Sequence, residues 1–216
     1  MKRQQQQARF SIAIVGEGFT EWKYFDYIRI TRRYFFTLKP ELPKHSNYKT
    51  VFKKGKELAS KAYDLVFCVV DIDTIYNQRK MSEFIKACKS LPKSVIPITS
   101  MPCIEFWFYL HLIDYPIFRL YTSYEELYLQ LKKKIPDYEK TKKYFDQSDI
   151  FSRLEINGGI DRALKNSEAI LDGKTNDCSF SEISLVLQQL EACKECKYKN
   201  KCLKCCEKLI DNKNNY

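Results

Sequence analysis

The first hundred residues contain three apolar runs that are rich in β-branched side chains. These runs are FSIAIVG at 10–16, DLVFCVVDID at 64–73 and SVIPITS at 94–100. Continuous apolar runs of this length are typical of strands that are buried on both faces of a parallel sheet. The sequence therefore predicts three strands in this part of the chain.

Stretches with helical periodicity alternate with these runs. Apolar residues recur near the 3.6-residue period in the segments 21–35, 54–63 and 78–91, which predicts helices. Thr20 offers an N-cap for the first of them, and a polar, proline-containing stretch at 37–50 separates the first helix from the second. Strands that alternate with helices predict an α/β domain with a largely parallel sheet.

Beyond residue 100 the strand signals fade and helical patterns dominate. The predicted helices of this part are 104–112, 123–135, 158–171 and 180–192. The predicted organisation is thus an α/β domain at 10–105, a helical region at 106–192 and a short cysteine-rich tail at 193–216.

Composition narrows the class of protein. With 44% hydrophobic residues the chain can bury a substantial core, as a folded domain requires. The longest apolar stretch, at 101–118, is interrupted by Glu105, His111 and Asp114, which argues against a membrane span. The N-terminus is basic but continues into glutamines, so we expect no secretory signal and a cytoplasmic protein.

The formal net charge of +10 is concentrated in one segment, which runs from Arg29 to Lys61 and contains ten basic residues against Glu41 and Glu57. Such a basic segment attracts polyanions, and nucleic acid is the commonest polyanion of the cytoplasm. The candidate nucleic-acid contacts are Arg29, Arg32, Arg33, Lys53, Lys54 and Lys56. The alternative is a lysine-rich surface without a specific partner.

Acidic residues follow both strong strands. The first strand runs into Glu17, with Glu21 one helical turn further on, and the second ends in Asp71 and Asp73. The i, i+2 spacing of the two aspartates would place both on the same face of the strand. Sites of parallel sheets gather at the carboxyl ends of strands, and converging carboxylates select hard cations such as Mg²⁺ or Mn²⁺. Two such ions can promote phosphodiester cleavage.

Each acid also has an ordinary structural interpretation. Glu21 favours the positive end of a helix, Asp71 and Asp73 suit a turn after a strand, and Glu17 could be an exposed loop acid. The glycines beside Glu17 begin like a dinucleotide-binding fingerprint, but Glu21 stands at the position of its third glycine. They favour a tight turn that lets Glu17 reach a cation, with Gly18 leaving room for a phosphate oxygen.

Glu105 lies in a segment that is apolar at every helical offset. A buried carboxylate needs a metal ion or a charged partner, so it either supports the site or pairs with an Arg or Lys. His111 on the same helix is more readily a hydrogen-bonded core histidine than a catalytic residue.

Several of these residues carry a family likeness. The segments IVGEGFTEWKYF, DLVFCVVDIDT and SMPCIEFWFYLHL, in this order, resemble the RloB family, and CSFSEISLVLQQL is similar to its C-terminal helix. The likeness covers about residues 10–192. Members of this family have a Toprim-type catalytic domain, so the resemblance implies a Toprim-like, Rossmannoid parallel sheet.

The resemblance also implies roles for the acids. Toprim domains handle Mg²⁺ and phosphodiesters with a glutamate after the first strand and an Asp-x-Asp after a later one, which correspond here to Glu17, Asp71 and Asp73. Glu21 matches the second acid of the Glu-Gly-x-x-Glu form of the overcoming-lysogeny-defect nucleases. RloB-like proteins are associated with bacterial phage-defence loci, which implies a defence role and a partner such as an ATPase or another defence-system protein.

The cysteine-rich tail lies outside this likeness. It contains Cys193-x2-Cys196 and Cys202-x2-Cys205, separated by five residues. Paired Cys-x2-Cys elements suit tetrahedral Zn²⁺, and the alternative is a lysine- and cysteine-rich helix without metal. Without a secretory signal we expect reduced cysteines, and three that lie in apolar contexts are expected to be core thiols: Cys68, Cys88 and Cys103.

Two functions fit the sequence. The first is an Mg²⁺- or Mn²⁺-dependent nuclease of RNA or DNA, in which Glu17 is a general base or metal ligand, Asp71 and Asp73 are metal ligands, and Glu21 and Glu105 assist. The alternative is a non-cleaving subunit of a defence complex that binds nucleic acid or a nucleotide.

Overall fold

A five-stranded sheet forms the centre of the fold in the computed structural model, which describes residues 10–39, 46–61, 63–173 and 177–195. The strand order is β2-β1-β3-β4-β5, with the first four strands parallel and β5 antiparallel to β4. The strands are β1 (Ile12–Val15), β2 (Thr37–Lys39), β3 (Leu65–Asp71), β4 (Val95–Met101) and β5 (Phe180–Ser181). Every residue of β1 and β4 is buried, as is every residue of β3 before Asp71. The apolar runs of the sequence therefore became the three central strands.

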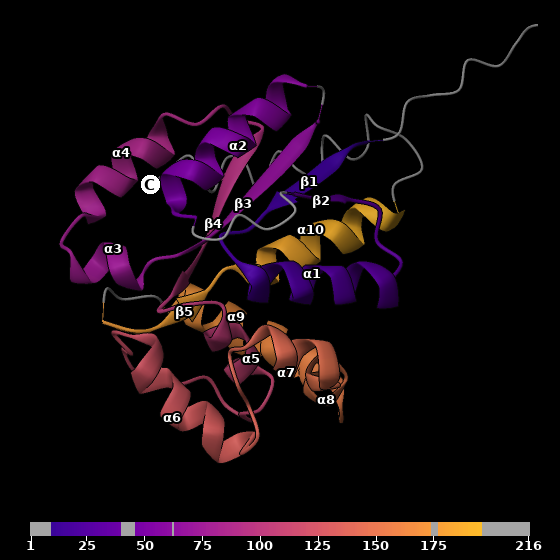
Figure 1. The fold of residues 1–216 in the computed structure, drawn as a ribbon, viewed down its shortest axis with the longest axis vertical. Helices are drawn as coiled ribbons and strands as arrows, with labels where there is room; N and C mark the ends of the chain where they lie inside the picture. The colour runs from indigo at the N-terminus through magenta and orange to yellow at the C-terminus, as the bar shows by residue number, and fades with distance from the viewer. Residues whose placement is uncertain (1–9, 40–45, 62, 174–176, 196–216) are drawn as a thin grey trace, which may run out of the picture.

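Helices cover both faces of this sheet. Those that pack on it are α1 (Phe19–Thr31), α2 (Tyr48–Ser60), α4 (Met81–Lys89) and α10 (Ile183–Glu195), and the short α3 (Asp73–Asn77) precedes α4. Figure 1 shows α2 and α4 on one face and α1 and α10 on the other. Gly55 allows α2 to lie close to β3, because a Cβ at this position would overlap the sulfur atom of Cys68.

The remaining helices form a second part beside the sheet, at the bottom of Figure 1. They are α5 (Glu105–Leu110), α6 (Tyr124–Lys134), α7 (Lys142–Gln147), α8 (Ile150–Glu155) and α9 (Gly159–Asp172). All residues of α5 are buried, and Trp107 Nε1 of this helix donates a hydrogen bond to the Tyr24 hydroxyl of α1 at 2.6 Å. An ion pair between Lys23 and Asp146 at 2.5 Å also joins α1 to α7. The two parts therefore share one packed interior.

The predicted α/β architecture, with a mostly parallel sheet and a helical C-terminal half, is confirmed. The C-terminal half also returns to the sheet, because it contributes the edge strand β5 and the helix α10. None of the helices in the described part of the chain has the length and apolar character that a membrane crossing requires.

Several local predictions were wrong. Thr20 is the second residue of α1 rather than its N-cap, which is Gly18. Asp73 begins α3, so it does not share a strand face with Asp71. Helix α2 starts at Tyr48, six residues earlier than predicted, because the side chain of Asn47 accepts a hydrogen bond from the backbone N–H of Thr50 and caps it, as asparagine often does.

Short elements were missed altogether. The strands β2 and β5 have three and two residues, which is too few for a period-of-two pattern to stand out. The helices α7 and α8 have six residues each, which is below two turns. Local periodicity therefore predicted the long elements and left the short connections to tertiary packing.

Candidate functional site

The acids lie at a switch point of the sheet. β1 and β3 are neighbours, yet the chain leaves β1 through α1 toward β2 and leaves β3 through α3 and α4 toward β4 on the other side. Connections that diverge in this way open a crevice at the carboxyl ends of the two strands, where ligands of parallel α/β folds bind. Val15 is in register with Cys68, and β3 continues to Asp71. Glu17, two residues beyond β1, therefore reaches the same end of the sheet.

The loop after β1 is shaped around Glu21. A Cβ on Gly16 would lie 2.9 Å from the Cβ of Glu21, and a Cβ on Gly18 would lie 3.2 Å from Oε2 of Glu21. Burial raises the pKa of Glu21, and a hydrogen bond from the backbone of Gly18 to its carboxylate opposes a small part of that rise. The expectation that Gly18 leaves space for a phosphate oxygen was therefore incomplete, because the Glu21 carboxylate occupies part of that space.

The connection after β4 carries Glu105 to the same edge of the sheet. Asp71 is paired with Ser100 across the ladder, and its Oδ1 accepts a hydrogen bond from the backbone N–H of Ile104 at 2.9 Å. This bond holds the turn that leads into α5, whose first residue is Glu105. The carboxylate oxygens of Asp71 and Glu105 and the sulfur of Cys103 lie within 4.8 Å of one another.

Glu105 is fully buried and has a cationic partner. Lys140 Nζ lies 2.9 Å from Oε1 and 3.0 Å from Oε2, and the Tyr138 hydroxyl donates to Oε1 at 3.1 Å. Glu105 therefore pairs with a lysine, as one alternative predicted, and it lies beside Asp71. Its supporting role in the site stays a prediction. Sequence reasoning missed Lys140, which stands in a polar segment between α6 and α7 that has no periodic pattern.

Burial and mutual repulsion raise the pKa values of these carboxyls. Burial, followed by the charges of Glu21 and Asp73, raises the pKa of Glu17 to about 9. Burial also raises the pKa of Glu21 and of Asp71, against the opposing effect of Lys140. Near neutral pH the cluster must hold protons or an added cation, because so many adjacent carboxylates cannot all be ionised at low cost.

Lys140 remains charged in this environment. Burial by itself would lower its pKa, but Glu105, Cys103 and Asp71 raise it above its ordinary value. Its charge acts on the pKa of three acids on two other connections, namely Glu17, Glu21 and Asp71. A single ammonium group thus offsets part of the charge of the whole cluster.

Asp73 approaches from α3. Its Oδ1 accepts hydrogen bonds from the backbone N–H and the hydroxyl of Thr74, at 2.5 and 3.2 Å. The charge of Asp73 contributes to the raised pKa of Glu17, which places the two acids in the same electrostatic environment. The five predicted acids therefore influence one another electrostatically. Among the described residues, only Asp71 and Glu105, together with Cys103, lie at the distances of a shared metal ligand set, and Asp73 arrives from a helix rather than from the strand.

The predicted basic contacts do not gather at these acids. Arg29, Arg32 and Arg33 lie at the C-terminal end of α1, roughly 15–20 Å along the helix from its start at the rise of α-helices. Arg29 pairs with Asp26 and Arg32 with Glu155. On α2, Lys54 pairs with Glu57, Lys56 bonds Ser90 and Lys53 is exposed.

His111 is a core residue. It is buried at the end of α5, and its Nδ1 lies 2.8 Å from the carbonyl oxygen of Trp107. Burial lowers its pKa to about 4, so the imidazole is neutral at physiological pH. Its catalytic interpretation finds no support in this geometry.

The cysteines divide between the core and the tail. Cys68 and Cys103 are buried as predicted, whereas Cys88 is only half-buried. Cys193 is half-buried at the end of α10, and its sulfur accepts a hydrogen bond from Gln189 Nε2 at 3.2 Å. The other three cysteines of the predicted zinc site (Cys196, Cys202 and Cys205) lie outside the described residues, so that site stays a prediction.

Comparison with known proteins identifies the family. The family model described as RloB-like protein matches residues 12–190, a range that includes all five acids and Lys140. No curated protein and no solved structure matches the chain. Because the matched range covers most of its 216 residues, the chain belongs to the RloB-like protein family.

Proposed function

We propose that this protein is a Toprim-type, metal-dependent nuclease that acts in bacterial anti-phage defence. The observation that carries the proposal is the convergence of buried and half-buried carboxylates from three separate connections at the switch point of the sheet. Structural acids are seldom buried in such numbers without equal numbers of cations, and perturbed pKa values in a crevice are typical of catalytic sites. Membership of the RloB-like family is consistent with the defence role.

The donor set fits Mg²⁺ or Mn²⁺, which prefer carboxylate oxygens. Glu17, Glu21, Asp71 and Asp73 would hold the ions, which when bound would supply an activated water and charge stabilisation for phosphodiester cleavage. Without a bound ion, the raised pKa of Glu17 keeps this carboxyl protonated near neutral pH, so a bound cation would displace that proton and leave a carboxylate that can act as a ligand or a general base. Lys140, held against Glu105, provides a fixed positive charge for a phosphate.

The test is incubation of the purified full-length chain with RNA and DNA in EDTA, Mg²⁺ or Mn²⁺. We expect cleavage with a divalent ion, no cleavage in EDTA, and no cleavage by Glu17→Gln. The matched control is Glu83→Gln, which removes an exposed glutamate of α4 that pairs with Lys49, and which should cleave normally. Equal cleavage by Glu17→Gln and the wild type would exclude this assignment of the site.

A second function is favoured by one observation. Lys140 already supplies a counter-charge to the cluster, as a site that binds a nucleotide or nucleic acid without cutting would need. In that case the protein is a non-cleaving subunit that works with a defence partner such as an ATPase. Stable association with such a partner, together with the absence of cleavage under every metal condition, would favour this function over the first.

A further inference from the structure

We propose that the site takes single-stranded nucleic acid, which a tyrosine–lysine face on α6 holds beside the carboxylates. This face consists of Tyr124, Tyr128 and Lys132 on α6, together with Lys140, which follows the end of that helix. The inference rests on the proposed nuclease function and deepens it, because it names the class of substrate. It places the substrate contacts on the helical part of the molecule rather than on the basic segment between Arg29 and Lys61.

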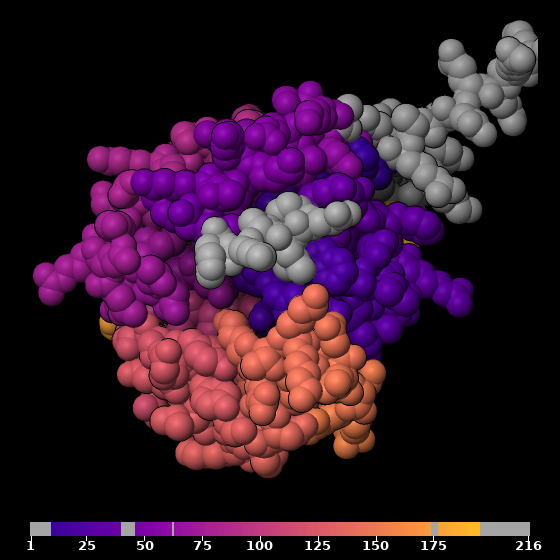
Figure 2. Space-filling model, in the orientation of Figure 1, coloured from indigo at the N-terminus to yellow at the C-terminus, as the bar shows by residue number. Residues whose placement is uncertain are grey.

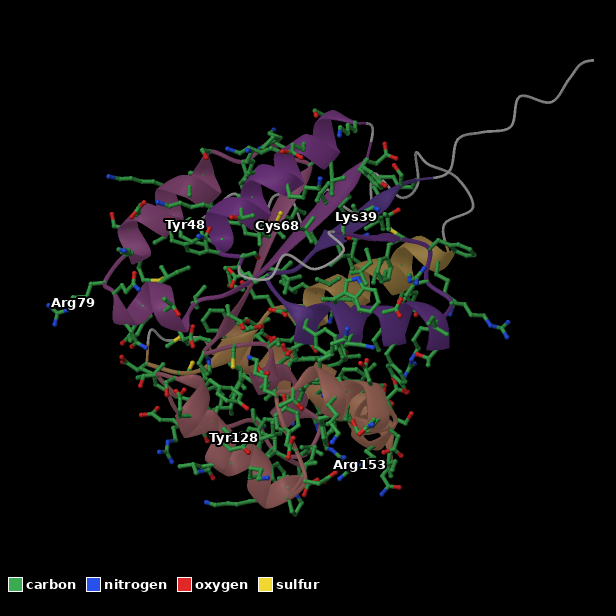
Figure 3. All side chains as sticks on the ribbon, viewed as in Figure 1. Lys39, Tyr48, Cys68, Arg79, Tyr128 and Arg153 are labelled. Atoms are coloured by element: carbon green, nitrogen blue, oxygen red, sulfur yellow. The ribbon has the colours of Figure 1, made fainter. Side chains whose placement is uncertain are left out.

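The two tyrosines form a continuous aromatic surface. They stand four residues apart on α6, so their side chains lie one above the other on the same side of the helix. Their ring centroids are 5.4 Å apart with an interplanar angle of 34°, and both side chains are half-buried. Tyr128 is backed by Tyr138, with ring centroids 6.3 Å apart. Part of each ring is therefore presented to solvent from a packed support; Figure 3 labels Tyr128 in the helical part of the molecule.

Lysine side chains accompany this aromatic surface. Lys132 Nζ lies 5.6 Å from the ring centroid of Tyr128, and Lys140 Nζ lies 4.7 Å from that of Tyr124. Lys133 and Lys134 follow on the exposed last turn of α6. Lys132, Lys133 and Lys134 form no ion pair within the described ranges, whereas Arg29 and Arg32 are both paired with acids. The charges of Lys132, Lys133 and Lys134 are thus available to a phosphate backbone, although Lys132 Nζ also donates to the carbonyl oxygen of Tyr138, whereas Lys140 is paired with Glu105.

Lys140 connects the face to the carboxylates. The same ammonium group that lies over the Tyr124 ring is 2.9 Å from Oε1 of Glu105. Tyr124 and Glu105 therefore flank a single cation, and the aromatic surface begins where the acidic cluster ends. Figure 2 shows the helical part, which contains α6, directly below the α/β layers on the same face of the molecule.

This combination selects unpaired strands. Aromatic side chains stack on the faces of bases, and those faces are accessible only when the bases are not stacked within a duplex. Lysines that track the backbone add affinity that depends on salt but not on sequence. A strand whose bases stack on Tyr124 and Tyr128 would carry its next phosphate toward Lys140 and the carboxylates.

The test is a binding measurement in EDTA, where no metal-dependent cleavage interferes. Fluorescence anisotropy with the full-length protein would compare a labelled single-stranded RNA, a single-stranded DNA of the same sequence and the corresponding DNA duplex. We expect both single strands to bind about tenfold more tightly than the duplex. The single strand that binds more tightly shows whether RNA or DNA is the natural substrate. Tyr124→Ala and Tyr128→Ala should each weaken single-strand binding about 10- to 100-fold, the usual effect of losing one stacked base.

Further variants separate stacking from folding. Tyr124→Phe and Tyr128→Phe keep the rings and should bind within about threefold of the wild type, whereas Tyr128→Leu keeps apolar volume without a ring and should bind as weakly as Tyr128→Ala. The matched control is Tyr115→Ala, which removes a tyrosine that is 81% exposed outside this face and should change nothing. Thermal unfolding of each variant checks that its fold is intact.

The outcomes distinguish this inference from the nuclease proposal. Single-strand binding that depends on the two rings supports the face even if no condition gives cleavage, and in that case only the nuclease proposal fails. Duplex binding as tight as single-strand binding, or full binding by Tyr124→Ala and Tyr128→Leu, overturns the face even if the protein cleaves.

Discussion

The acids of the site and the cations of the segment between Arg29 and Lys61 are equally conspicuous in the sequence. In the folded protein the acids lie close together, whereas the cations are spread over the surface. Acids from three connections converge at one edge of the sheet, where burial raises their pKa values. Most of the described cations of the basic segment lie on or next to α1 and α2, where several are paired with neighbouring acids. A cluster in sequence becomes a cluster in space only when strand order brings its members together.

The two regions also differ in how much their charges contribute to the free energy of folding. A paired cation at the surface contributes little, because water and salt screen it. A buried carboxylate without enough counter-charge costs several kcal/mol, and such a cost persists when function requires it. The acidic cluster is therefore the part of the molecule where small chemical changes should have large effects.

The largest effect should come from removing the charge of one acid of the cluster. Asp71→Asn keeps the shape of the side chain but removes a charge, and we expect cleavage to fall at least about 100-fold, as is usual for essential groups of this kind. Replacing Lys53, Lys54 and Lys56 together with glutamine should change the rate less than about threefold, because Lys54 pairs with Glu57 and Lys56 bonds Ser90, and surface charges of this kind are screened by water and salt. Single-turnover cleavage rates with Mg²⁺ measure both. A fall in the cleavage rate of the lysine variant by much more than about threefold would show that the basic segment contacts the substrate.

The next effect concerns stability. Lys140→Met leaves Glu105 buried without its cation, and we expect a loss of about 2 kcal/mol in the free energy of unfolding, less than for a fully buried pair because Lys140 is 37% exposed. Arg32→Met is a matched control, since Arg32 is 36% exposed but pairs with a more accessible acid, Glu155. It should cost no more than about 0.5 kcal/mol. Equal losses in urea unfolding of the two variants would show that the cluster does not depend on Lys140.

A smaller effect should appear as pH dependence. Because the folded pKa of Glu17 is about 9 and that of an unfolded glutamate is near 4.3, the folded protein holds a proton that the unfolded chain releases between these values. Stability without metal should therefore fall as the pH rises toward 9. The unfolding temperature in EDTA between pH 6.5 and 9 tests this above the range in which His111 titrates. Glu17→Gln should make the unfolding temperature less dependent on pH, and Mg²⁺ should raise the unfolding temperature of the wild type. The same pH dependence in Glu17→Gln and the wild type would contradict the assignment.

The smallest effect should come from the loop glycine. Gly18→Ala adds a Cβ 3.2 Å from Oε2 of Glu21, so the carboxylate must shift by a few tenths of an ångström. We expect Mg²⁺ affinity to fall about threefold to tenfold, with little change in stability. Gly173→Ala introduces a contact of the same length with a ring carbon of Phe118, away from the acids, and should leave Mg²⁺ affinity unchanged. Calorimetric titration of both variants decides whether the tight fit around Glu21 matters.

Features that depend on a local pattern could be predicted from the sequence. The three central strands were evident from their apolar runs, and Glu17, Glu21 and Asp71 followed from their places at or just beyond strand ends. Lys140 could not be found in this way, because 35 residues separate it from Glu105 and their contact arises only when the helical part packs against the sheet. The helical start at Asp73 and the strands β2 and β5 depend in the same way on neighbours that no local period reveals.

The contact between Lys140 and Glu105 has a consequence for the order in which the protein matures during synthesis. The acids lie within the first 105 residues, whereas their cation is added 35 residues later. A growing chain that has emerged only as far as α5 carries the acids of the site without the charge that balances them. Assembly of the site therefore waits for the helical part, and a nascent or truncated α/β fragment is without the complete centre.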